Sequence, residues 1–332
     1  MEDFKKMFLV MVTVLAASIV PVGCGSAKYK VGINTQNPIE IIETSQGFAI
    51  TEGEAKVLFY QREHKSLNGK YSRANYIHPL YGLDGEVLTE DFPADHLHHR
   101  GIFWAWHQVW LGNKRVGDPW AAKDFFWDVY DARILEIDSK SRSLQVYVHW
   151  KSPLWIDANG KQKAFVREVT NIQVHRAQDD IRKVDFEISL LALEDDIRIG
   201  GSEDDKGYGG FTTRIRLPDG LSFIGSNGPV EPNRLQVKAG PWLDFSGTFH
   251  KDGKASGLAI LCHKSSPGYP QPWILRRKGS AQNPVYPGRH PILLSREKPL
   301  VLRYRLVIHR GNVQQINLDK LQTEYNREIH PL

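Results

Sequence analysis

The feature that most constrains the fold is a two-residue alternation of apolar and polar side chains along most of the chain. Residues 144–150 (LQVYVHW), 184–192 (VDFEISLLA) and 300–309 (LVLRYRLVIH) all show it. Side chains of a strand point alternately to its two faces, so this period predicts strands with one buried face. Asp-Gly pairs at residues 84–85 and 252–253 are typical of turns between antiparallel strands. The sequence therefore predicts an all-β fold, a large antiparallel β-sandwich.

Helical signal is confined to the C-terminal segment. Asn317 can cap a helix that has Leu318 and Tyr325 on one face. Residues 25–38 are polar and lack periodicity, which is typical of a tether. With 41% hydrophobic residues, the remaining chain is long enough to bury a large core. We predict a single β-sandwich domain over residues 39–332, with a short C-terminal helix.

The N-terminus has the order of an export signal. Lys5 and Lys6 precede the uncharged residues 7–22, and a Gly-Cys junction follows at Cys24. The junction resembles a bacterial lipoprotein signal, in which Cys24 becomes the lipidated first residue; ordinary cleavage is the alternative. The apolar stretch is shorter than the roughly 20 residues of a spanning helix. We predict that residues 1–24 are a signal peptide and that the protein is exported, as a cell-envelope lipoprotein or in the periplasm. Any membrane contact would be through the lipid.

Charge and cysteine content restrict the partners further. The formal net charge is +5, and the 43 basic and 38 acidic residues are interspersed. This mixture disfavours nucleic acid as a partner and permits an acidic sugar. If Cys24 carries lipid, Cys262 is the only thiol left, so no intramolecular disulfide is expected.

One short segment concentrates the polar groups that chemistry requires. Residues 95–101 (DHLHHRG) contain three of the 13 histidines, a carboxylate and a guanidinium. The segment follows the turn-rich residues 78–85 and precedes an aromatic strand at residues 102–106. We predict that it forms the working site.

The first interpretation of this segment is acid–base catalysis. In an extended backbone, His96 and His98 share one face and Asp95 and His99 the other. His98 or His99 would act as the general acid or base, because an imidazole can give and take a proton at neutral pH. Asp95 would orient it, and Arg100 would hold a developing oxyanion or a carboxylate.

The second interpretation is a metal site. His96 and His98 have the spacing by which one strand offers two imidazoles to a divalent Zn, Fe or Mn ion. A third ligand would come from His78, His263 or Glu231. A third interpretation is structural, with the histidines bonding backbone carbonyls of the loop.

Residues elsewhere in the chain are expected to bind the substrate. Lys206 and Tyr208 lie in a glycine-rich loop that lacks the ending of a phosphate-binding loop. Tryptophan rings suit the apolar faces of sugars. The predicted substrate-binding residues are His78, Trp104, Lys206, Tyr208, His263, Trp273 and Arg276.

Five segments resemble a bacterial family labelled "methane oxygenase PmoA": residues 76–82, 91–101, 206–210, 240–247 and 302–305. The resemblance covers most of residues 40–311, and the histidine motif is its most specific part. It implies sugar-utilisation systems and a fold similar to the galactose-mutarotase supersandwich. We do not expect the labelled activity, because a membrane-embedded oxygenase needs several spanning helices and this chain offers none after its signal.

Together these features predict an exported carbohydrate-active enzyme that performs proton-transfer chemistry on a sugar, as an epimerase, lyase or hydrolase. Epimerisation, β-elimination and glycoside cleavage all remain open. The alternatives are a metal-dependent enzyme with a His-x-His site and a non-catalytic glycan-binding lipoprotein.

Overall fold

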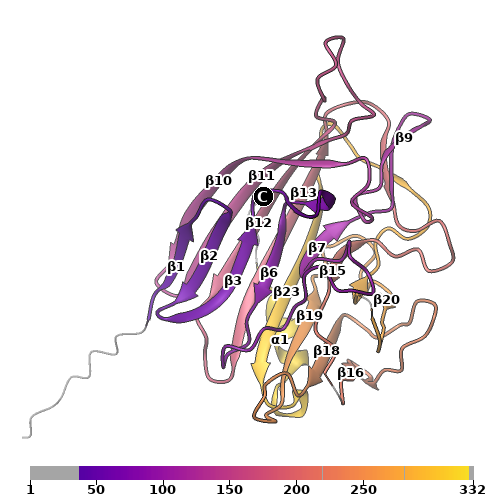
Figure 1. Ribbon diagram of the computed structural model, residues 1–332. Coiled ribbons are helices and arrows are strands. Elements are labelled where there is room, and N and C mark those ends of the chain that lie inside the picture. Colours follow the sequence, from indigo (N-terminus) through magenta and orange to yellow (C-terminus); the bar gives the residue numbers. More distant parts are fainter. Residues whose placement is uncertain (1–36, 219, 280, 329–332) are drawn as a thin grey trace, which may run out of the picture. The chain divides into compact units, whose positions relative to one another are not determined.

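A nine-stranded antiparallel sheet contains the longest strands of the computed structural model (Figure 1), which describes residues 37–218, 220–279 and 281–328. The order in this sheet is β10 (Phe126–Asp138), β11 (Ser141–Lys151), β12 (Val166–His175), β13 (Ile181–Ala192), β23 (Leu300–Arg310), β19 (Ser256–Cys262), β18 (Trp242–Gly247), β16 (Ser222–Gly225) and β17 (Gly228–Pro229). The three runs of alternating residues lie in β11, β13 and β23, as their period predicts.

A six-stranded antiparallel sheet forms the second layer. Its order is β1 (Ile39–Glu43), β2 (Gly47–Glu52), β3 (Ala55–Gln61), β6 (Tyr76–Leu80), β7 (Ile102–Ala105) and β15 (Gly210–Thr213). A smaller sheet has the order β22 (Ile292–Leu293), β14 (Ile197–Gly200), β8 (Gln108–Leu111) and β9 (Lys114–Gly117). Two-stranded hairpins are β20 (Trp273–Ile274) with β21 (Asn283–Pro284), and β4 (Lys65–Leu67) with β5 (Lys70–Arg73).

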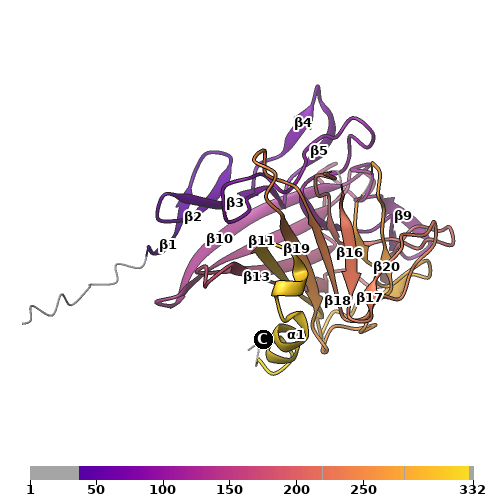
Figure 2. The same ribbon diagram turned by 90° about the horizontal axis from the view of Figure 1, so that it is seen from below.

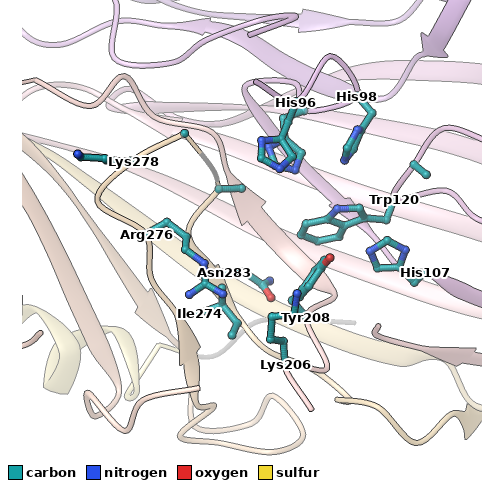
Figure 3. A pocket seen from close by; sticks show the side chains of 14 residues that line it. His96, His98, His107, Trp120, Lys206, Tyr208, Ile274, Arg276, Lys278 and Asn283 are labelled. Atoms are coloured by element: carbon teal, nitrogen blue, oxygen red, sulfur yellow. The ribbon is translucent and has the colours of Figure 1, made fainter. Parts of the chain in front are cut away.

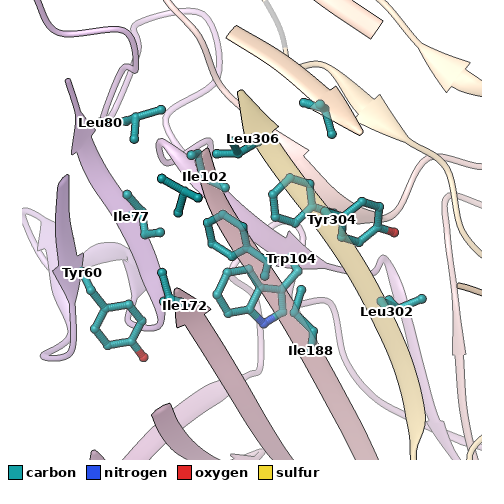
Figure 4. Close-up of a cluster of buried hydrophobic side chains, with 14 of the residues drawn as sticks. Tyr60, Ile77, Leu80, Ile102, Trp104, Ile172, Ile188, Leu302, Tyr304 and Leu306 are labelled. Atoms are coloured by element: carbon teal, nitrogen blue, oxygen red, sulfur yellow. The ribbon is translucent and has the colours of Figure 1, made fainter. Parts of the chain in front are cut away.

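The two large sheets pack face to face, and β1–β3 lie over β10–β13 in Figure 2. One continuous core joins them, because buried side chains of both sheets contact one another. Figure 4 shows Ile77 and Trp104 of the six-stranded sheet beside Ile172, Ile188 and Leu302 of the nine-stranded sheet. The predicted antiparallel β-sandwich is confirmed.

A buried carboxylate ties the two sheets together. Glu168 of β12 is fully buried and accepts four hydrogen bonds. Its donors in the six-stranded layer are Asn75 Nδ2 at 2.8 Å and Trp104 Nε1 at 2.7 Å. Within its own sheet, Trp150 Nε1 donates at 2.7 Å and Thr170 Oγ1 at 2.8 Å. Burial raises the pKa of Glu168, and these hydrogen bonds act against that rise.

The predicted C-terminal helix is also confirmed. After the short 3-10 turn η1 (Val313–Gln315), helix α1 spans Leu318–Tyr325, and the Asn317 side chain accepts a hydrogen bond from the Lys320 amide at 2.9 Å. Leu318 and Tyr325 are buried against the outer face of the nine-stranded sheet.

The described residues belong to one compact unit that begins at Asn37. Residues 1–24, the lipidation site Cys24 and most of the proposed tether lie outside the described residues, so the signal and the domain limits stay predictions. In the part of the chain that the structure describes, no helix is long and apolar enough to cross a membrane.

Candidate functional site

A pocket of about 330 Å³ lies between the loops that flank β7 and β15 and the β20–β21 hairpin. Figure 3 shows His96 and His98 on one side of it and Arg276 and Asn283 on another, with the ring of Tyr208 between these groups. The histidines of the predicted motif and the predicted residues Lys206, Tyr208 and Arg276 thus share one cavity, although Lys206 lies more than 100 positions and Arg276 more than 170 positions after the motif.

The histidine segment is a pair of turns and not the extended backbone expected from its sequence. The His96 amide donates to the Pro93 carbonyl at 3.0 Å, and the His99 amide donates to the His96 carbonyl at 2.8 Å. The turns bring all three imidazoles together. The rings of His96 and His99 stack with centroids 4.6 Å apart, and the His98 ring lies 4.6 Å from His99, edge to face.

Asp95 orients His96, whereas His98 or His99 was the partner predicted from the sequence. His96 Nδ1 lies 2.8 Å from Asp95 Oδ2. Arg214 clamps the same carboxylate with two hydrogen bonds, at 2.9 and 2.6 Å. Burial alone would raise the pKa of Asp95, but the bonds from Arg214 and His96 hold it well below its ordinary value, so it stays charged.

Only glycine fits beside this carboxylate at position 279. A Cβ on Gly279, whose φ is +44°, would lie 2.7 Å from Asp95 Oδ2. The β20–β21 hairpin can therefore close against the Asp95–His96 pair, which completes the pocket wall.

His98 and His99 are neutral at ordinary pH. Burial lowers the pKa of His98 to about 4 and that of His99 to about 2, and neighbouring cations and imidazoles contribute. They can therefore hydrogen-bond a ligand but are poor proton carriers near pH 7. This leaves His96, with its carboxylate partner, as the best candidate among the three for acid–base work.

These buried imidazoles should make the fold sensitive to acid. Their folded pKa values lie below that of an unfolded imidazole, so the unfolded chain binds more protons and stability falls as the pH drops below about 6.5. We expect His99→Phe to reduce this loss by about 1 kcal/mol per pH unit, because it keeps a ring and removes a titrating group. Urea unfolding at several pH values checks it; an unchanged slope would contradict it.

An aromatic cluster next to the histidines was not predicted from the sequence. His107 Nδ1 lies 3.0 Å from Asp118 Oδ2, and the His107 ring stacks on Trp120 at 5.4 Å. Trp120 and His107 line the pocket, as does Tyr208, whose ring lies 4.9 Å from Trp120. The signal for His107 was its position directly after the aromatic strand. Trp120 carried no comparable signal.

Asn283, also missed, fixes the loop that carries Tyr208. Its Nδ2 donates to the carbonyls of Gly209 at 3.2 Å and Phe211 at 2.7 Å, and its Oδ1 accepts from the Gly209 amide at 3.1 Å. The Tyr208 ring is thereby held in the pocket. Burial raises the pKa of Tyr208, so its phenol keeps its proton at neutral pH.

The structure does not bring Arg100 to the pocket. Its guanidinium is fully buried, with Nε 2.5 Å from Asp91 Oδ1, and it donates to the carbonyls of Tyr71 at 3.0 Å and Lys65 at 2.9 Å. Arg100 therefore anchors the β4–β5 hairpin and does not line the pocket, where it was predicted to hold an oxyanion or a carboxylate.

Four predicted substrate-binding residues also lie outside this pocket. Trp104 and Trp273 are buried, and their Nε1 atoms donate to Glu168 and to the Gly240 carbonyl. His78 Nδ1 lies 3.0 Å from Thr89 Oγ1. His263 packs edge to face on Tyr325, with ring centroids 4.9 Å apart.

None of the third ligands predicted for the metal interpretation, His78, His263 and Glu231, lines the pocket with His96 and His98. The rings of His96 and His98 lie 5.7 Å apart, edge to face. Within residues 37–218, 220–279 and 281–328, no group of three or more His, Cys, Asp or Glu side chains is arranged to hold a metal ion.

Comparisons with known proteins place the chain in a family without assigning an activity. No curated protein matches it. A solved structure from Salmonella typhimurium, described as a "putative mutarotase (YeaD)", is 11% identical, with 82% of this chain and 90% of that chain covered and a TM-score of 0.29. The methane oxygenase family that the five sequence segments resemble does not appear in these comparisons. Residues 48–323 match the family of unknown function DUF6807, and the chain therefore belongs to that family.

Proposed function

We propose that this protein is an enzyme that transfers protons on a sugar, with His96 and Tyr208 as the groups that exchange protons with the substrate. The observation that carries the proposal is the Asp95–His96 pair in a pocket that also holds the Tyr208 ring. An imidazole with a carboxylate partner can accept a proton, because the carboxylate stabilises the cation that forms. Tyr208 retains its proton and can donate it.

The pocket suits a sugar in size and lining. Its volume of about 330 Å³ falls in the range of small-molecule sites. The partly exposed Tyr208 offers a ring surface for the apolar face of a pyranose, and Trp120 packs behind it, while His98 offers a hydrogen-bonding group for hydroxyls. The carbohydrate substrate class rests on this combination.

Epimerisation or β-elimination fits the pocket better than glycoside cleavage. Most glycosidases use two carboxyl groups that flank the scissile bond. Among the described residues that line the pocket, none is Asp or Glu. Asp95 and Asp118 lie behind His96 and His107, where they act on the imidazoles. Removal and return of a proton by His96 and Tyr208 requires no such carboxyl pair.

A panel of neutral and acidic sugars followed by proton NMR in D2O tests the proposal. Deuterium entering a C–H bond, or an unsaturated product, reports proton removal. We expect wild type to act on at least one sugar and Tyr208→Phe to lose roughly 100-fold in turnover, since it lacks only the hydroxyl. His250→Gln is the matched control, because His250 pairs with Asp252 at 2.6 Å and does not line the pocket. Binding without turnover would contradict the proposal and indicate a glycan-binding protein.

A further inference from the structure

We propose that the substrate is an acidic sugar whose carboxylate binds Arg276. This inference rests on the proposed function, since it names the substrate of the same pocket. Three cationic residues, Lys206, Arg276 and Lys278, line the pocket together with four histidines. No carboxylate among the described lining residues offsets them.

The nearby carboxylates are committed to other partners. Asp95 is held by Arg214 and His96, and Asp118 is held by His107. Asp204 pairs with Lys206 at 2.9 Å, so it neutralises one of the three cations and leaves the other two. The pocket therefore presents an excess of positive charge, which favours an anionic ligand.

The guanidinium of Arg276 keeps two N–H donors for a ligand. Its Nη1 donates to the carbonyls of Asn233 at 2.6 Å and Leu275 at 2.8 Å, and its Nη2 donates to the Arg234 carbonyl at 2.9 Å. These bonds use three of the five N–H groups and fix the plane of the guanidinium. No carboxylate in the described part of the chain forms an ion pair with Arg276. The remaining Nε and Nη2 hydrogens match the two oxygens of one carboxylate.

A further cation, Arg73, is fully buried close to His98 and His99. Arg73 stacks between Phe103 and Trp127, at 4.6 and 4.5 Å, and its Nη2 donates to the carbonyls of Pro119 and Trp120. None of the described carboxylates pairs with it, and its Nε and Nη1 have no hydrogen-bond partner in the described residues. A charge in such an apolar site acts over a long range, so Arg73 adds to the positive potential of the pocket.

A carboxylate on Arg276 would also assist the proposed chemistry. Once the guanidinium neutralises it, the adjacent C–H bond becomes more acidic, because the electron pair left on carbon delocalises into the carboxylate. His96 would take that proton. The carbanion would then either regain a proton on the opposite face, which is epimerisation, or expel the oxygen substituent on the next carbon, which is β-elimination. Tyr208 would supply the proton in either case.

Isothermal titration calorimetry with galacturonate, glucuronate, galactose, glucose and glucose 6-phosphate tests the inference. We expect a uronate to bind at least about tenfold more tightly than its neutral parent, as a charged hydrogen-bonded pair provides. Arg276→Gln should remove this preference and leave the neutral sugar unaffected. Because Arg276 also holds the carbonyls of residues 233 and 234, a second variant is needed. Lys278→Gln alters only an exposed side chain and should weaken the uronate alone.

The outcomes separate this inference from the proposed function. If a uronate binds with the expected preference but is never turned over, the result supports the inference and contradicts the proposed enzymatic function. If neutral sugars are turned over and uronates do not bind, the result supports the proposed enzymatic function and overturns the inference. A uronate preference that survives in Arg276→Gln overturns the assigned residue, and tighter binding of the sugar phosphate overturns the carboxylate assignment. No uronate binding to folded wild type also overturns it.

Discussion

Replacing Glu168 with alanine is expected to lower the free energy of unfolding by about 4 kcal/mol, because four buried donors lose their acceptor. For a chain of this size the melting temperature should fall by roughly 10 °C. Two of the donors belong to each layer of the sandwich, so the substitution removes hydrogen bonds that hold the two layers together. Denaturant unfolding and calorimetry measure both quantities.

Two further variants separate hydrogen bonding from volume. Glu168→Leu fills the space but accepts no hydrogen bond, so it should be about as damaging as alanine. Glu168→Gln keeps one acceptor oxygen and turns an amide donor toward other donors, so an intermediate loss is expected. A leucine variant as stable as wild type would show that the buried network contributes nothing net, as occurs for some buried charges.

The sheets were predictable from sequence because their side-chain period is local. Residues 144–150 are a continuous strand with alternate residues buried, as the pattern required. The hydrogen-bond donors of Glu168 were not predictable, since a single acidic residue in a strand does not indicate which tryptophans will donate to it. The same tertiary contact explains Trp104, which the sequence placed in the substrate site and the structure places in the core.

The candidate site was predictable only in part. Residues 95–101 were recognisable from composition, yet the expected extended backbone would have separated Asp95 from His96. The turns place these neighbours in hydrogen-bonding contact instead. Arg276 was predicted as a site residue, whereas Trp120 was not. The position of Trp120 depends on a hydrogen bond that Arg73 Nη2 donates to the Trp120 carbonyl, which holds the loop near the pocket. Such long-range contacts leave no periodic trace in the sequence.

His96→Asn is expected to reduce turnover on the order of 1,000-fold, because it removes the only imidazole in the histidine segment that is paired with a carboxylate. Substrate affinity should be kept, since Tyr208 and Arg276 remain. Turnover measured with the substrate that the sugar panel identifies, together with calorimetric binding, checks both parts. A variant that retains wild-type turnover would exclude His96 as the proton carrier.

Asp95→Asn separates positioning from proton transfer. The imidazole stays, but the charge that stabilises its cation is lost, so we expect a smaller loss of turnover and a shift of the acid side of the pH–rate profile to lower pH. Arg214 keeps its bond to Glu90 at 2.8 Å, so the loop retains an anchor. His250→Gln again serves as the control. If Asp95→Asn lowers turnover without moving the profile, Asp95 acts only by holding the loop, and the carboxylate–imidazole pair is structural.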